Sequence, residues 1–82
     1  MKKNPHLQSV ILEVVDNQLK ANEPPETRQT FDRLVSEGYS EEDAKKLIGS
    51  VVASEIFDVL KKQKPFNRER FVKALNKLPK LP

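Results

Sequence analysis

The stretch that decides the fold is residues 40–62, which read SEEDAKKLIGSVVASEIFDVLKK. Ser40 is a suitable N-cap, and the three acidic residues that follow it stand where the helix dipole is positive. Apolar residues then recur at three- and four-residue steps, which predicts a helix over 41–62. Because these apolar residues cover far more than one narrow stripe, we expect this helix to be the central and most buried one.

Prolines and a glycine divide the chain before this stretch into two further helices. Asn4-Pro5 opens a helix over 5–21, since Asn can cap the first turn and Pro is suited to the first helical position. Asn22-Glu23-Pro24-Pro25 ends that helix and begins another over 25–37. Gly38 can adopt the left-handed conformation that terminates the second helix.

One more helix is predicted after the central one. Asn67 is its N-cap, and its apolar positions predict a helix over 68–78. No stretch shows the alternating pattern of a strand. The fold class is therefore all-α, with one compact four-helix domain over residues 1–82 and flexible ends at 1–3 and 79–82.

Three of the helices are expected to supply the core. Its predicted members are Phe31, Leu34, Leu47, Ile48, Val51, Ile56 and Phe71. Gly49 and Ala53 are small and lie one turn apart on the central helix. Because both side chains are small, we expect a neighbouring helix to approach closely there. The glycine lowers the helix propensity by about 1 kcal/mol.

The composition offers little for catalysis or metal binding. The 82 residues include no cysteine, which makes thiolate zinc sites impossible, and the one histidine, His6, cannot form the usual histidine clusters of catalytic metals. Because no Ser-His-Asp set or glycine-rich phosphate loop can be identified, we predict no enzyme activity and no cofactor. No apolar run approaches the roughly 20 residues of a membrane helix, so a cytoplasmic protein without a membrane partner is expected.

Charge is divided unevenly along the chain. Residues 1–60 hold 7 Lys and Arg against 11 Asp and Glu, a net −4, whereas residues 61–82 hold 8 against 1, a net +7. The candidate basic patch consists of Lys61, Lys62, Lys64, Arg68, Arg70, Lys73 and Lys77. Such a patch attracts phosphate, but Phe71 belongs to the apolar side of its helix, so no aromatic is available for stacking bases. A solvated helix face is the preferred interpretation.

Glu55 is the one polar residue whose position the composition does not explain. At about 100° per residue it falls in the middle of the central helix's apolar arc, so it is predicted to point into the bundle. A lone buried carboxylate is costly and needs partners. Helical projection places Gln18 and Arg28 on inward-facing positions of the first two helices, so Gln18, Arg28 and Glu55 form a candidate polar cluster. We favour a packed ion pair that fixes helix register over the floor of a small polar binding pocket.

Short patterns spread over nearly the whole chain resemble those of a known family. They are Asn4-Pro5-x-Leu7, Gln18-Leu19, Asn22-x-Pro24-Pro25-x-x-Arg28, Glu55 and Phe71-x-x-x-Leu75. Their order is similar to that of an uncharacterised bacterial family of small helical domains of unknown function. The resemblance implies a helical fold and no activity. Members often carry histidines on the first helix, where this chain has Gln8 and Leu12, so a metal site there would not transfer.

The sequence therefore predicts a small structural or protein-interaction module without catalytic activity, whose protein partner is unknown. The alternative is a weak nucleic-acid binder that uses the basic C-terminal helix.

Overall fold

The computed structural model describes residues 5–81 and has, within that range, four α-helices and no strand. The helices are α1 (Pro5–Ala21), α2 (Pro25–Ser36), α3 (Glu41–Lys62) and α4 (Arg68–Lys77). The all-α prediction is confirmed. The predictions for residues 1–4, for the His6 side chain and for Pro82 lie outside the described residues, and the flexibility of 79–81 stays a prediction.

Side-chain caps begin the two helices that build the C-terminal half of the molecule. The Ser40 hydroxyl accepts a hydrogen bond from the Asp43 N–H at 3.0 Å, which starts α3. The Asn67 side chain accepts one from the Arg70 N–H at 3.0 Å, which starts α4. Both predicted caps are confirmed, and each satisfies an amide that would otherwise lack a partner in the first turn.

Helices α2 and α4 each end one residue earlier than predicted. After α2, Gly38 has φ +106°, and the Tyr39 N–H reaches back to the Leu34 carbonyl at 3.1 Å, which closes the helix end. After α4, Leu78 has ψ 142° because the following Pro79 excludes the helical conformation. The two ends thus follow from a left-handed glycine and from a proline.

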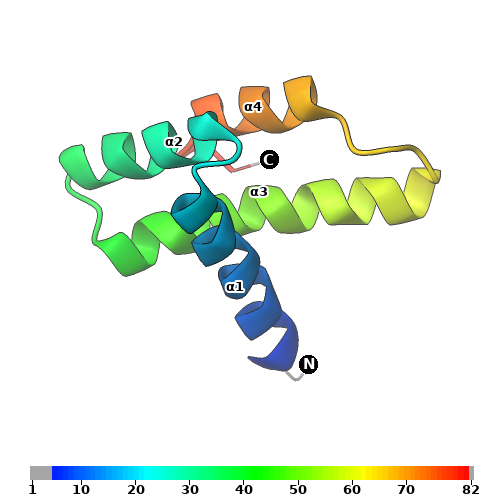
Figure 1. Cartoon of the computed structure of the whole chain (residues 1–82), viewed down its shortest axis with the longest axis horizontal. Helices are drawn as coiled ribbons and strands as arrows, with labels where there is room; N and C mark the ends of the chain where they lie inside the picture. The colour runs from blue at the N-terminus through cyan, green and yellow to red at the C-terminus, as the bar shows by residue number, and fades with distance from the viewer. Residues whose placement is uncertain (1–4, 82) are drawn as a thin grey trace.

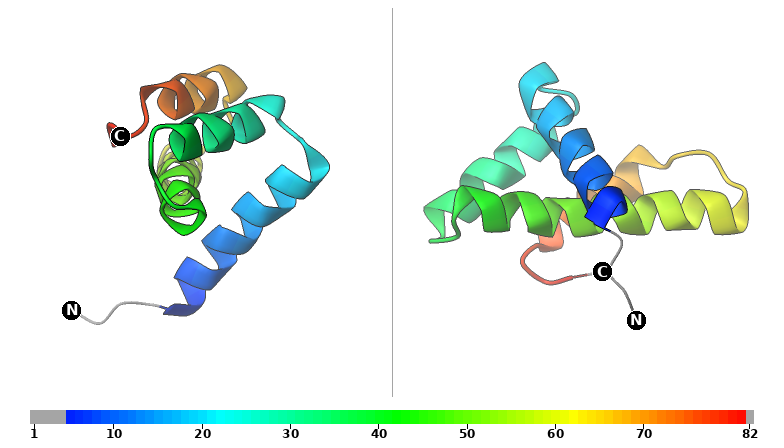
Figure 2. Two further views of the ribbon diagram at one scale, coloured as in Figure 1. Left: turned by 90° about the vertical axis from the view of Figure 1, so that its left-hand side faces the viewer. Right: turned by 90° about the horizontal axis from the view of Figure 1, so that it is seen from below.

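The long helix α3 organises the other three (Figure 1). α2 lies along its N-terminal half, and α4 starts beside its C-terminal half and runs back over its middle, on the same side of α3. α1 crosses α3 on another side, and its N-terminal end points away from the other helices (Figure 2, left). Among residues 5–81, no Cα of α1 comes within 8 Å of a Cα of α4. A part of α3 therefore lies uncovered between α1 and α4.

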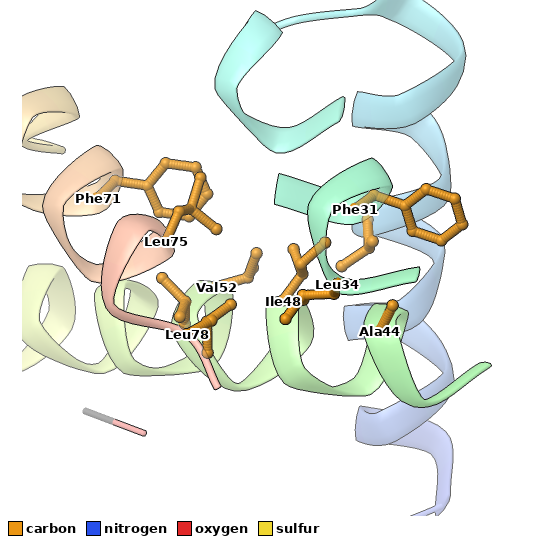
Figure 3. Close-up of a cluster of buried hydrophobic side chains, with 10 residues drawn as sticks. Phe31, Leu34, Ala44, Ile48, Val52, Phe71, Leu75 and Leu78 are labelled. Atoms are coloured by element: carbon orange, nitrogen blue, oxygen red, sulfur yellow. The ribbon is translucent and has the colours of Figure 1, made fainter. Parts of the chain in front are cut away.

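Buried side chains of α2, α3 and α4 point toward one another and form most of the core (Figure 3). The buried apolar residues of the described chain are Val15, Phe31, Leu34, Ala44, Ile48, Val51, Val52, Phe71, Leu75 and Leu78. Five of the seven predicted core residues are among them. Leu47 is only half-buried, and the prediction for Ile56 is wrong because 41% of this residue is exposed.

The predicted close approach at Gly49 is also present. A Cβ atom at this position would lie 3.2 Å from Cγ2 of Ile11, so α1 crosses α3 where α3 has no side chain. The small residue therefore sets how near α1 can pack.

Arg33 joins α2 to the end of α4. Its guanidinium donates to the carbonyl of Leu78 at 2.8 Å and to that of Leu75 at 3.1 Å. The Leu75 carbonyl also accepts the Leu78 N–H at 3.1 Å, and the Arg33 cation complements the negative end of the α4 dipole. Arg33 thus fixes α4 beside α2.

Candidate functional site

Glu55 lies on α3 and is buried, with 7% of the residue exposed, as predicted. Its carboxylate receives two hydrogen bonds from Arg70 of α4: Nε donates to Oε2 at 3.0 Å and Nη2 to Oε1 at 2.7 Å. The Asn67 backbone N–H donates to Oε1 at 3.3 Å. A bidentate Arg–carboxylate pair of this kind is geometrically specific, so it fixes the start of α4 against α3.

The ion pair changes the titration of both groups. The hydrogen bonds from the Arg70 guanidinium hold the pKa of Glu55 below its ordinary value, although burial acts in the opposite direction. The Glu55 carboxylate in turn raises the pKa of Arg70. Both side chains are therefore charged at neutral pH, and the carboxylate has no need of an external cation.

Arg28 is not the partner of Glu55, so the predicted pairing is wrong. The Arg28 Nε lies 3.5 Å from Oδ1 of Asp32 in the same helix, and about half of its side chain is exposed. Its guanidinium carbon stands 5.6 Å from the centroid of the Phe31 ring. The reason is topological: α2 lies along the N-terminal half of α3, whereas Glu55 belongs to the half beside α4.

Gln18, the third predicted member of the cluster, lies near Glu55 but does not bond to it. Its side-chain oxygen accepts a hydrogen bond from the hydroxyl of Thr27 at 3.0 Å. Thr27 is fully buried, so this bond satisfies a polar group between α1 and α2. Gln18 and Glu55 both line one surface groove, which leaves two of the three predicted residues in one place.

This apolar groove opens between α1, the C-terminal half of α3 and the start of α4. Its volume is about 290 Å³, and it is lined by Val14, Gln18, Val52, Glu55, Ile56, Val59, Leu60, Phe66 and Phe71. Val52 and Phe71 are buried, whereas Leu60 is 73% exposed and Phe66 56% exposed. The groove thus has a packed bottom and apolar walls that water contacts.

The groove follows from the way the helices are connected. Residues 63–67 turn the chain back so that α4 covers one side of α3, and α1 crosses α3 farther toward its N-terminus, at Gly49. Ile56 and Leu60 point into the space between these two helices. The missing contact between α1 and α4 therefore explains why Ile56 is exposed.

The predicted basic patch is divided among several carboxylates. Arg70 binds Glu55, and Arg68 lies 3.6 Å from Glu23 and 3.4 Å from Glu26. Lys62 Nζ is 4.0 Å from Asp58 Oδ1. Within residues 5–81, the members without an ion pair are Lys61, Lys64, Lys73 and Lys77. The patch is therefore not one continuous basic stripe.

Arg70 is a member of the predicted basic patch, but in the structure it is the partner of Glu55. On a helical projection of α4 it lies at the edge of the apolar arc, next to Ala74, and not on the outer face. The short connection at 63–67 also implies that the first turn of α4 returns alongside α3, close to Glu55. Those two signals together could have identified the pair.

The described residues contain neither a helix long and apolar enough to span a membrane nor a group of three His, Cys, Asp or Glu side chains arranged to hold a metal ion. No family model, curated protein or solved structure matches the chain. The resemblance to a bacterial family therefore stays a prediction.

Proposed function

We propose that this chain is a non-catalytic protein-interaction module whose apolar groove receives apolar side chains of a partner protein. The observation that carries the proposal is the exposure of Ile56, Leu60 and Phe66 around one groove. Single exposed apolar residues are common on protein surfaces, but a contiguous set that lines a concavity is typical of a binding site.

The construction of the groove supports this function. Val52 and Phe71 form a buried floor, and the bidentate pair of Glu55 with Arg70 fixes the two helices that carry them. A partner would therefore meet a formed surface and would not have to order it. Preorganisation of this kind lowers the entropic cost of association.

Weak nucleic-acid binding remains the alternative proposal. Lys73 and Lys77 are exposed on α4 without an ion pair in the described part of the chain. Against this alternative, the guanidinium groups of Arg68 and Arg70 are already engaged by carboxylates. Fewer free cations mean fewer phosphate contacts and a weaker affinity.

Affinity capture with three forms of the protein tests the proposal. The baits are the parent, Leu60→Gln in the groove and the matched control Phe57→Gln, because Leu60 and Phe57 are both 73% exposed on α3 but only Leu60 lines the groove. Lysate from the source cell is used before and after nuclease treatment.

We expect a protein that the parent and Phe57→Gln retain, that Leu60→Gln loses and that nuclease does not release. Equal capture by all three baits would contradict the groove. Capture that nuclease abolishes would favour the nucleic-acid alternative.

A further inference from the structure

We propose, building on the interaction function above, that the partner segment is an amphipathic helix with acidic residues bordering its apolar face. The groove gives the shape of this partner, and the lysines around its end give its charge.

The shape favours a helix. The groove lies between α1, α3 and the start of α4, with Ile56 and Leu60 one turn apart along α3. A helix that lies there can insert side chains at positions i, i+3, i+4 and i+7, which is a common mode of peptide recognition. It would fill the space between α1 and α4, where no helix of the described chain packs.

The charge at the end of the groove is positive. We call Lys61, Lys62 and Lys64 the lysine rim; in the sequence they lie between Leu60 and Phe66, which both line the groove, and all three are exposed.

The positive charge exceeds what the protein itself neutralises. The lysine rim carries three charges, whereas Asp58 supplies one negative charge and the C-terminal end of the α3 dipole is equivalent to about half of one. Glu55 is neutralised by Arg70. The remaining charge is complementary to acidic residues at the edge of a partner helix.

A second copy of this chain fits the groove less well. In a two-fold symmetric dimer both copies use the same surface, so each would bring the same lysine rim to the contact, and the groove lining offers it no carboxylate other than Glu55, which Arg70 already neutralises. Like charges placed together oppose association. The rim therefore favours a different protein of opposite charge.

A lipid surface also fits less well, although exposed apolar residues and lysines can bind anionic membranes. Such a surface is broad, whereas Val52 and Phe71 lie buried at the bottom of a groove. Only a narrow ligand can use both the floor and the walls.

Three helical peptides test the proposal. They share one apolar face with Leu at i, i+3, i+4 and i+7 and differ in the residues that border it, which are Glu, Gln or Lys. Each is titrated into the isotope-labelled parent protein, and the methyl resonances of Ile56 and Leu60 are followed, with the buried Leu34 as the reference. Affinities are measured at low and high ionic strength.

We expect the Glu peptide to shift the groove methyls and to bind about tenfold more tightly than the Lys peptide, with a preference that salt reduces. The double variant Lys61→Glu/Lys64→Glu should reverse the order of the peptides. The matched control Lys73→Glu/Lys77→Glu makes the same charge change on α4 and should keep the order.

The outcomes separate this inference from the function it builds on. Equal affinities of the three peptides at the groove would overturn the acidic partner and leave the interaction function standing. If no peptide shifts the groove methyls, the proposed function fails as well. If the Ile56 and Leu60 resonances shift with protein concentration in the absence of peptide, the occupant is a second copy of the chain. If anionic phosphatidylserine vesicles bind and displace the Glu peptide, the occupant is a membrane. Either result overturns the proposal.

Discussion

The C-terminal half of α3, residues 52–62, has six apolar residues against four in the N-terminal half, residues 41–51, and yet it is the more exposed half. In the N-terminal half, Ala44, Ile48 and Val51 are buried against the neighbouring helices. In the C-terminal half, Ile56 is 41% exposed, and Phe57 and Leu60 are each 73% exposed. Since both halves belong to one helix, apolar composition alone does not decide whether a segment is core or surface.

The difference comes from what packs on each half. α1 and α2 both contact α3 near its N-terminal half, and Gly49 lets α1 approach closely. Along the C-terminal half, the start of α4 and the connection of residues 63–67 lie beside α3, and the apolar groove stays open. The N-terminal half of α3 therefore contributes more to the core, whereas the C-terminal half carries the proposed binding surface.

Two isoleucines on α3 provide the largest expected contrast. Ile48 is fully buried, so Ile48→Ala should lower the free energy of unfolding by about 2–5 kcal/mol, a large share of the total stability of a small domain. Ile56→Ala should cost much less because part of this side chain already contacts water. Urea unfolding of the two variants measures both values. Equal losses would remove the distinction between the two halves.

Two arginines give the next largest contrast. Arg70→Ala should lower the midpoint of urea unfolding, because it leaves the buried Glu55 carboxylate without its partner. Arg28→Ala should leave the midpoint almost unchanged, since the ion pair of Arg28 with Asp32 is exposed.

A double variant sharpens this second test. Glu55→Leu combined with Arg70→Met removes both charges together, so it should recover much of the stability that Arg70→Ala loses. A destabilised Arg28→Ala variant with an unaffected Arg70→Ala variant would show that the pair is assigned to the wrong residues.

Acid should weaken the contact between α3 and α4. The folded-state pKa of Glu55 lies below its ordinary value of 4.5, so the stabilisation is present above pH 4.5 and is lost as pH falls through the folded-state value. The difference in unfolding free energy between the parent and Glu55→Gln should therefore be largest near neutral pH and shrink in acid. Urea titrations across this range measure it, and a difference that stays constant with pH would contradict the ion pair.

Variants at the exposed apolar residues of α3 should have the smallest effect on stability. Leu60→Gln and Phe57→Gln both replace residues that are 73% exposed, so each should change the free energy of unfolding by no more than about 0.5 kcal/mol. Thermal melts of the two variants check this. A large loss in Leu60→Gln alone would mean that Leu60 belongs to the core and not to a binding surface.

Much of the fold could be predicted from local signals. Ser40, Asn67 and Gly38 each determine a helix end through their own backbone or side chain, and the structure has all three where the sequence placed them. The burial of Glu55 could also be predicted, because it depends only on the periodicity of one helix. Local chemistry therefore gave the elements and the orientation of this residue.

The periodicity of one helix predicts neither the partner of Glu55 nor the groove. Both depend on which helix packs on which half of α3, and this is set by the path of residues 63–67 and by the crossing of α1 at Gly49. Periodicity shows that Ile56 and Leu60 are apolar, but it does not show that α1 and α4 leave them uncovered. Contacts between distant segments decide that point.

The most direct test of the central claim is the affinity of the Glu-bordered helical peptide for the parent, Leu60→Gln and Phe57→Gln. Burying one leucine is worth about 1.5–3 kcal/mol, and 1.4 kcal/mol corresponds to a tenfold change in affinity. Leu60→Gln should therefore weaken binding by about tenfold or more, whereas Phe57→Gln, outside the groove, should bind as the parent does. Equal affinities of Leu60→Gln and the parent would contradict the claim that the exposed half of α3 is a binding surface.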